Sequence, residues 1–151
     1  MVKIYTSRDN YEGEDKVSTA IRTTGGENPM APTWPMIMGR KLDQAQIENN
    51  EADIAKWSTS KVSGKAIEPL SDEGFTQQYV TLLRDRYQED PQPFLDLLNK
   101  DQITITGYAG AEEFDPRHVA ANVLEKIGKK HEIPVERGGE IDARTGRPWI
   151  A

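Results

Sequence analysis

The sequence predicts an α/β protein, a Rossmann-like three-layer sandwich with a mostly parallel sheet. Short segments in which apolar and polar residues alternate lie near both ends of the chain, and helical patterns lie between them. A third observation is the order strand, loop, helix in ITITGYAGAEEFDPRHVAANVLEKI, residues 103–127. A chain of 151 residues is long enough for one domain with its own core.

The composition narrows the function classes. Nineteen Lys and Arg against twenty-five Asp and Glu give a net charge of −6, which disfavours a broad basic face for duplex nucleic acid but permits a small phosphate site. The absence of cysteine excludes disulfides, thiolate metal sites and a Cys nucleophile, and two histidines disfavour a His-rich metal centre. No apolar run approaches the ~20 residues that span a bilayer, and MVKIYTSRDN lacks a signal-peptide core. We therefore expect a soluble, cytoplasmic protein with no membrane partner, no metal and no cofactor.

The first half of the chain predicts two strands and one helix. VKIYTS at residues 2–7 alternates apolar and polar residues, and residues 17–24 are rich in β-branched side chains, so both segments predict strands. The Gly- and Pro-rich residues 25–35 predict a loop. The apolar residues between positions 37 and 56 are loosely spaced at helical intervals, which predicts one helix, and residues 58–74 predict a connector.

The second half predicts three helices and a strand. Ser71 and Asp72 are typical of a helix start, and another helix follows Pro91. DQITITGY predicts the clearest strand of the chain, and Asp115 and Pro116 are the expected N-cap and first residue of the last helix. The apolar faces of the three helices are formed by Phe75, Tyr79, Leu82 and Leu83, by Phe94, Leu95, Leu97 and Leu98, and by Val119, Ala120, Val123, Leu124 and Ile127.

The C-terminal part of the sequence contains weaker signals. HEIPVE, residues 131–136, predicts a short last strand. We therefore expect one α/β domain over residues 1–135 and a poorly ordered tail over residues 136–151.

The segment that follows DQITITGY carries the candidate site. In open α/β sheets, ligands bind outside the carboxyl ends of the strands, where N–H groups of the next helix face them. Gly107 and Gly110 would let a ligand approach the backbone closely. Arg117 supplies a planar fork suited to phosphate, and His118 can donate a hydrogen bond or carry a proton near neutral pH. These residues predict a small anion-binding pocket with one titratable group.

Arg117 and His118 are unusual in a first helical turn, because unpaired backbone N–H groups give that turn a partial positive charge. Either the protein's own acids, such as Glu113 and Asp115, offset this cost, or an anion from outside does. We expect the Asp115 side chain to accept a backbone N–H from Arg117 or His118 as a helix cap.

Three residues elsewhere are further ligand-binding candidates. Trp34, beside two prolines, is suited either to stack on a ring or to anchor its loop. Tyr108 is a candidate second wall for a ring. Arg22 either points into the crevice at the strand ends or lies in solvent.

The second half of the chain resembles the uncharacterised domain-of-unknown-function family 488, through GFTQQYVTLLRDRY and PFLDLLNKDQITITGYAGAEEFDPRHVAANVLEKI. KIYTS and the Pro-x-Trp loop in IRTTGGENPMAPTWP add to the resemblance. The resemblance implies that Arg117 and His118 match the last two positions of the family's Cys-His-Arg-His motif, which opens a helix. Asp115 and Pro116 replace its Cys and first His, the positions that Cys- or metal-dependent chemistry would need.

Together these patterns predict a protein that binds a phosphate-bearing ligand, a nucleotide or a flipped or terminal nucleotide of a nucleic acid, at residues 107–118. Whether it is an enzyme stays open; in a reaction, His118 would carry the proton and Arg117 would stabilise charge. The alternative is an acidic protein–protein module, such as a phage or mobile-element regulator or inhibitor in the host cytoplasm. Its acidic surface would bind a basic protein partner.

Overall fold

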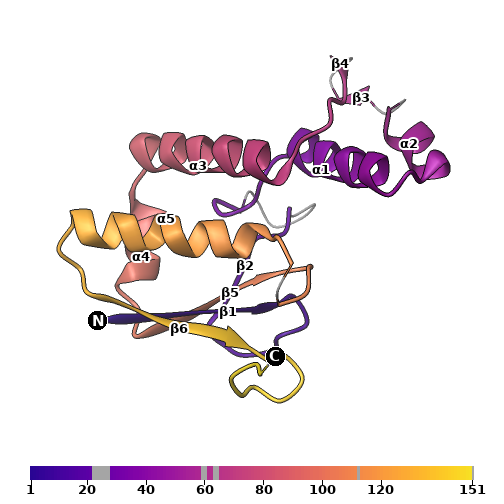
Figure 1. Cartoon of the computed structure of the whole chain (residues 1–151). Helices are drawn as coiled ribbons and strands as arrows, with labels where there is room; N and C mark the ends of the chain where they lie inside the picture. Colours follow the sequence, from indigo (N-terminus) through magenta and orange to yellow (C-terminus); the bar gives the residue numbers. More distant parts are fainter. Residues whose placement is uncertain (22–27, 59–60, 63–64, 112, 151) are drawn as a thin grey trace. The chain divides into compact units, whose positions relative to one another are not determined.

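The computed structural model describes every residue except 22–27, 59–60, 63–64, 112 and 151 (Figure 1). Its contacts divide the chain into two compact units, one formed by Met1–Ala31 with Val80–Ala151 and the other by Pro32–Tyr79. Residues 136–150 belong to the first unit, and the single domain expected over residues 1–135 stays a prediction.

The first unit is built on a four-stranded sheet in the order β2-β5-β1-β6, in which every pair of neighbours is parallel. This sheet confirms the predicted α/β class and is consistent with a three-layer α/β sandwich. The strands are β1 (Val2–Arg8), β2 (Lys16–Ser18), β5 (Gln102–Gly107) and β6 (Val135–Ile141).

The register of the sheet brings the isoleucines of β1 and β5 to one side. Ile4 pairs with Ile103 and Thr6 pairs with Ile105, and paired residues of parallel strands face the same way. The last helix, α5 (Pro116–Lys130), contacts both β1 and β5 and runs along the sheet in Figure 1. A shorter helix, α4 (Gln92–Leu98), contacts α5. The strand predicted at DQITITGY and the helices expected after Pro91 and Asp115 are thus confirmed.

The predicted strand over residues 17–24 is much shorter than expected. Only β2, Lys16–Ser18, pairs along β5, and residues 22–24 lie outside the described part of the chain. The Ser18 hydroxyl accepts the N–H of Ala20, and the Asn28 amide donates to the carbonyls of Ser18 and Ala20. These local bonds occupy groups that a longer strand would present to a neighbour.

The C-terminal residues form an edge strand of the sheet, where we expected a poorly ordered tail from residue 136. β6 pairs with β1 along Val135–Ile141, with a register shift and a positive φ of 88° at Gly139. The chain then turns back, and the N–H of Trp149 donates to the Glu140 carbonyl at 2.9 Å. Four of the seven β6 residues are exposed, so the strand lacks the apolar alternation that would have revealed it.

In the second unit, two helices cover the segment for which the sequence predicted one. α1 (Trp34–Ile47) and α2 (Glu51–Ser58) replace the single helix expected over residues 37–56. Asn49 has a positive φ of 53°, and the Asn50 side chain accepts the N–H of Asp53 at 3.1 Å. Asparagine tolerates the left-handed conformation and is a preferred N-cap, so this pair ends one helix and starts the next.

The predicted connector over residues 58–74 contains a short antiparallel pair, β3 (Lys61–Val62) and β4 (Lys65–Ala66). It leads to α3 (Asp72–Glu89), whose start is capped by the Ser71 hydroxyl, which accepts the N–H of Gly74. None of the helices in the described part of the chain combines the length and apolarity that crossing a membrane requires.

Candidate functional site

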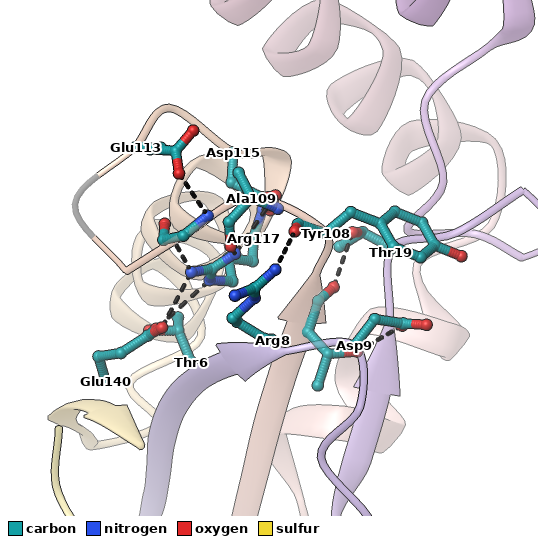
Figure 2. Close-up of polar contacts among 12 residues, drawn as sticks. Thr6, Arg8, Asp9, Thr19, Tyr108, Ala109, Glu113, Asp115, Arg117 and Glu140 are labelled. Carbon is teal, nitrogen blue, oxygen red and sulfur yellow. Dashed lines mark hydrogen bonds and ion pairs between the residues drawn. The ribbon is translucent and has the colours of Figure 1, made fainter. Parts of the chain in front are cut away.

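Arg117 lies at the centre of a buried ion network at the carboxyl edge of the sheet (Figure 2). Its side chain is 0% exposed. The guanidinium forms a two-pronged contact with Glu140, with Nη2–Oε2 at 2.9 Å and Nε–Oε1 at 3.3 Å. Nη1 donates to the Ala109 carbonyl at 2.8 Å and lies 3.3 Å from Asp115 Oδ2, while Nη2 also donates to the Gly110 carbonyl at 3.1 Å. The fork is thus satisfied by the protein itself.

Asp115 holds the start of α5 and the preceding loop together. Its Oδ1 accepts the N–H of Arg117 at 2.9 Å, which confirms the predicted cap, and its Oδ2 accepts the N–H of Ala109 at 2.9 Å. A Cβ at Gly107 would lie 1.9 Å from Asp115 Oδ1. Gly107 therefore makes room for this carboxylate.

Three residues of the predicted anion site at the start of α5 contact other groups of the protein itself. Arg117 faces Glu140 and the loop carbonyls, and Asp115 accepts the N–H of Arg117 with Oδ1 and the N–H of Ala109 with Oδ2. The space beside Gly107 is filled by the Asp115 carboxylate. Arg117 pairs with acids of the protein itself, Asp115 and Glu140, as the first of the two interpretations expects. Ligand binding at the helix start stays a prediction. Glu140 lies in the segment that we expected to be a poorly ordered tail.

Glu140 is held from two sides. Besides the Arg117 fork, its Oε1 accepts the Thr6 hydroxyl at 2.6 Å. Thr6 and Glu140 are register partners on β1 and β6, so their side chains emerge on the same side of the sheet. Among the described residues, every buried side-chain nitrogen or oxygen has a hydrogen-bond partner, as expected where charge is removed from water.

His118 is half-buried beside this network. Burial lowers the pKa of its imidazole, and the neighbouring Arg117 guanidinium lowers the pKa further; Glu140 and Asp115 oppose these effects, and Arg137 adds to them. The folded protein thus favours the neutral ring. His118 does not line the cavity described below, and its role as proton carrier stays a prediction.

This pKa shift predicts a loss of stability as the pH falls below about 6.5. The unfolded His118 takes up a proton near that ordinary value, whereas the folded one takes it up only at a lower pH. The unfolded state therefore binds more protons in this window, and folding weakens as the pH decreases. Urea unfolding at several pH values between about 5 and 8 measures the free energy of unfolding as a function of pH. This free energy should change less with pH for His118→Gln than for the unmodified protein. The same pH dependence in both proteins would contradict the lowered pKa of His118.

Tyr108, Trp34, Arg22 and Gly110 are the other predicted ligand-binding residues. The Tyr108 side chain is 68% exposed, and its ring points away from Arg117 in Figure 2; burial and the nearby Asp9 raise its pKa. Trp34 starts α1 in the other unit and is 52% exposed. Arg22 lies outside the described residues. Gly110 is the predicted residue that the structure does place on a cavity.

That cavity of about 360 Å³ opens at the carboxyl ends of β1 and β6, next to the loop that follows β5. Its volume is within the ~300–1,000 Å³ typical of ligand pockets. Its walls come from the end of β1, the loop after β5 and the C-terminal turn. The lining residues are Arg8, Asn10, Gly110, Ala111, Glu140, Ile141, Asp142, Ala143, Arg144 and Trp149.

Arg8 stands out among the charged groups of the lining. Glu140 is neutralised by Arg117, and Asp142 is paired with Arg144, with Nη2–Oδ2 at 3.3 Å. Across the described residues, the exposed Arg8 forms no ion pair, and its hydrogen bond is a long one of 3.4 Å from Nη2 to the Tyr108 carbonyl. Its guanidinium is therefore the cation of this cavity with the most donors left for a ligand.

Sequence reasoning missed Arg8, Asn10, Arg144 and Trp149. The predicted strand VKIYTS ends one residue before Arg8. Arg144 and Trp149 lie in the segment that we expected to be a poorly ordered tail. A signal was nevertheless present, because Arg8 ends the first strand and Asn10 comes two residues later, and the carboxyl ends of parallel strands meet at one edge of the sheet.

The chain matches no family model, no curated protein and no solved structure. The resemblance to domain-of-unknown-function family 488 stays a prediction. Within the described residues, no group of three or more carboxylates and imidazoles is arranged to hold a metal ion. Function therefore rests on the geometry of the cavity.

Proposed function

We propose that the chain binds a phosphate-bearing ligand, a nucleotide or the terminal nucleotide of a nucleic acid, in the cavity at the carboxyl ends of β1 and β6. The exposed guanidinium of Arg8 carries this proposal, because it faces a cavity of ligand size without a carboxylate partner among the described residues. Arginine binds phosphate through a rigid fork of donors. The acids of the lining do not cancel this attraction, since each is held by another arginine.

A planar group on the ligand has a wall to stack on. Trp149 lines the same cavity and is 36% exposed. Its backbone N–H is held by the Glu140 carbonyl, so the ring is carried by an ordered segment. Stacking between a base and an aromatic ring contributes about 1–3 kcal/mol, which favours nucleotides over phosphate alone.

Replacing Arg8 by glutamine should weaken binding of inorganic phosphate and of nucleoside monophosphates by about tenfold or more, since a hydrogen bond to a charged group contributes about 1.5–3 kcal/mol. Isothermal titration calorimetry measures the affinity, and a rise in melting temperature with ligand concentration confirms binding to the folded state. The matched control is Arg84→Gln, which removes the same charge from an exposed position on α3.

Equal weakening by both variants would mean that net charge, and not the Arg8 fork, attracts the ligand. Absence of binding by phosphate, nucleotides and short single strands would contradict the proposal. That result would favour the alternative class, an acidic protein–protein module with a basic partner.

A further inference from the structure

We propose that Arg144 is a second anion-binding arm of the same cavity, so that the site selects ligands with two adjacent phosphates over ligands with one. This inference rests on the proposed function and specifies its ligand class as diphosphate-bearing compounds. Two guanidinium groups, Arg8 from the end of β1 and Arg144 from the C-terminal turn, line one cavity of about 360 Å³. One phosphate engages Arg8, and the second engages Arg144.

The turn that carries Arg144 is anchored by its backbone. The Asp142 N–H donates to the Arg147 carbonyl at 2.8 Å, the Gly146 N–H donates to the Asp142 carbonyl at 2.8 Å, and Gly146 has a positive φ of 72°. Ile141 forms a bridge with Pro148. The backbone of the turn is thus held at the sheet edge, while the long Arg144 side chain is 83% exposed.

The present partner of Arg144 is a carboxylate that a phosphate can replace. Arg144 Nε and Nη2 lie 3.4 and 3.3 Å from the Asp142 carboxylate oxygens. Both distances exceed those of strong charge-assisted hydrogen bonds, and an exposed pair of this kind contributes little to stability. A phosphate dianion offers more charge and more acceptor oxygens than one carboxylate, so the guanidinium gains by the exchange.

The Asp142 side chain keeps its position without the Arg144 guanidinium. Its Oδ1 accepts the backbone N–H of Arg144 at 2.9 Å, which is the local turn that Asp and Asn side chains both form. The Asp142 carboxylate therefore occupies the position on Arg144 that the second phosphate would take. Removing the Asp142 charge should free Arg144 without removing the turn.

The test compares pyrophosphate with inorganic phosphate by calorimetry on the full chain. We expect the unmodified protein to bind pyrophosphate about tenfold more tightly than phosphate, or better. In Arg144→Gln, pyrophosphate should keep only the advantage that its larger negative charge gives it, while the affinity for phosphate changes little. Asp142→Asn should raise pyrophosphate affinity severalfold. The control is Arg147→Gln, which removes the same charge from the same turn at a position outside the lining.

A pyrophosphate-to-phosphate ratio that is the same in Arg144→Gln and Arg147→Gln would overturn the inference. Phosphate binding that still depends on Arg8 would leave the proposed function standing in that case. If the unmodified protein binds neither anion, no nucleotide and no short single strand, both proposals are overturned together.

Discussion

Replacing Arg117 by methionine is expected to lower the free energy of unfolding by about 3–5 kcal/mol, a large share of the ~5–15 kcal/mol that stabilises an ordinary domain. The change leaves Glu140 and Asp115 near one another with little access to water and without the guanidinium that lies 2.9 and 3.3 Å from their oxygens. It also leaves the Ala109 and Gly110 carbonyls without their donor. Chemical denaturation followed by circular dichroism measures the loss.

Two further variants separate the buried network from a general effect of charge. Arg137→Met removes a half-exposed arginine that pairs with Glu125 on the surface, and we expect it to cost at most about 1 kcal/mol. Arg117→Met combined with Glu140→Gln should be less destabilised than Arg117→Met alone, because the second change removes the stranded charge. A loss for Arg117→Met no larger than that for Arg137→Met would show that water reaches these carboxylates.

Gly107→Ala should destabilise the protein by about 1–3 kcal/mol, the usual cost of forcing extra volume into a packed site. The new methyl group would lie 1.9 Å from Asp115 Oδ1 and 2.5 Å from its Cγ. Asp115 cannot move aside freely, since both of its oxygens accept backbone N–H groups and it lies beside Arg117. The expected result combines overpacking with partial loss of the α5 cap, measured by the same denaturation experiment.

Gly74→Ala is the matched control for this prediction. Gly74 lies in the first turn of α3, where alanine is the better helix former. Its added Cβ would meet the end of the flexible Leu70 side chain at 3.1 Å, which can shift. We expect a change of less than about 1 kcal/mol in either direction. If the two variants behave alike, the close approach of Asp115 to β5 has no energetic consequence.

Several parts of this protein follow from local sequence. The alternation in β1 and β5 reflects which side chains face the helices, and the start of α5 follows from Asp115 and Pro116. Ser71 likewise marks the start of α3. These features depend on residues within one turn of one another, so that short-range propensity and capping determine them. The α/β class follows from their order along the chain.

Only the tertiary structure decided the identity of the site. Arg117 and Glu140 are separated by twenty-three residues and meet because β6 lies beside β1. β6 is stabilised by pairing with β1, and its exposed residues give no periodic signal. The sequence by itself determined that a cation needed an anion at the start of α5. The fold determined that Glu140 joins Asp115 as this anion, because parallel pairing brings distant strand ends to one edge. Arg8 and Arg144 line the cavity at the same edge.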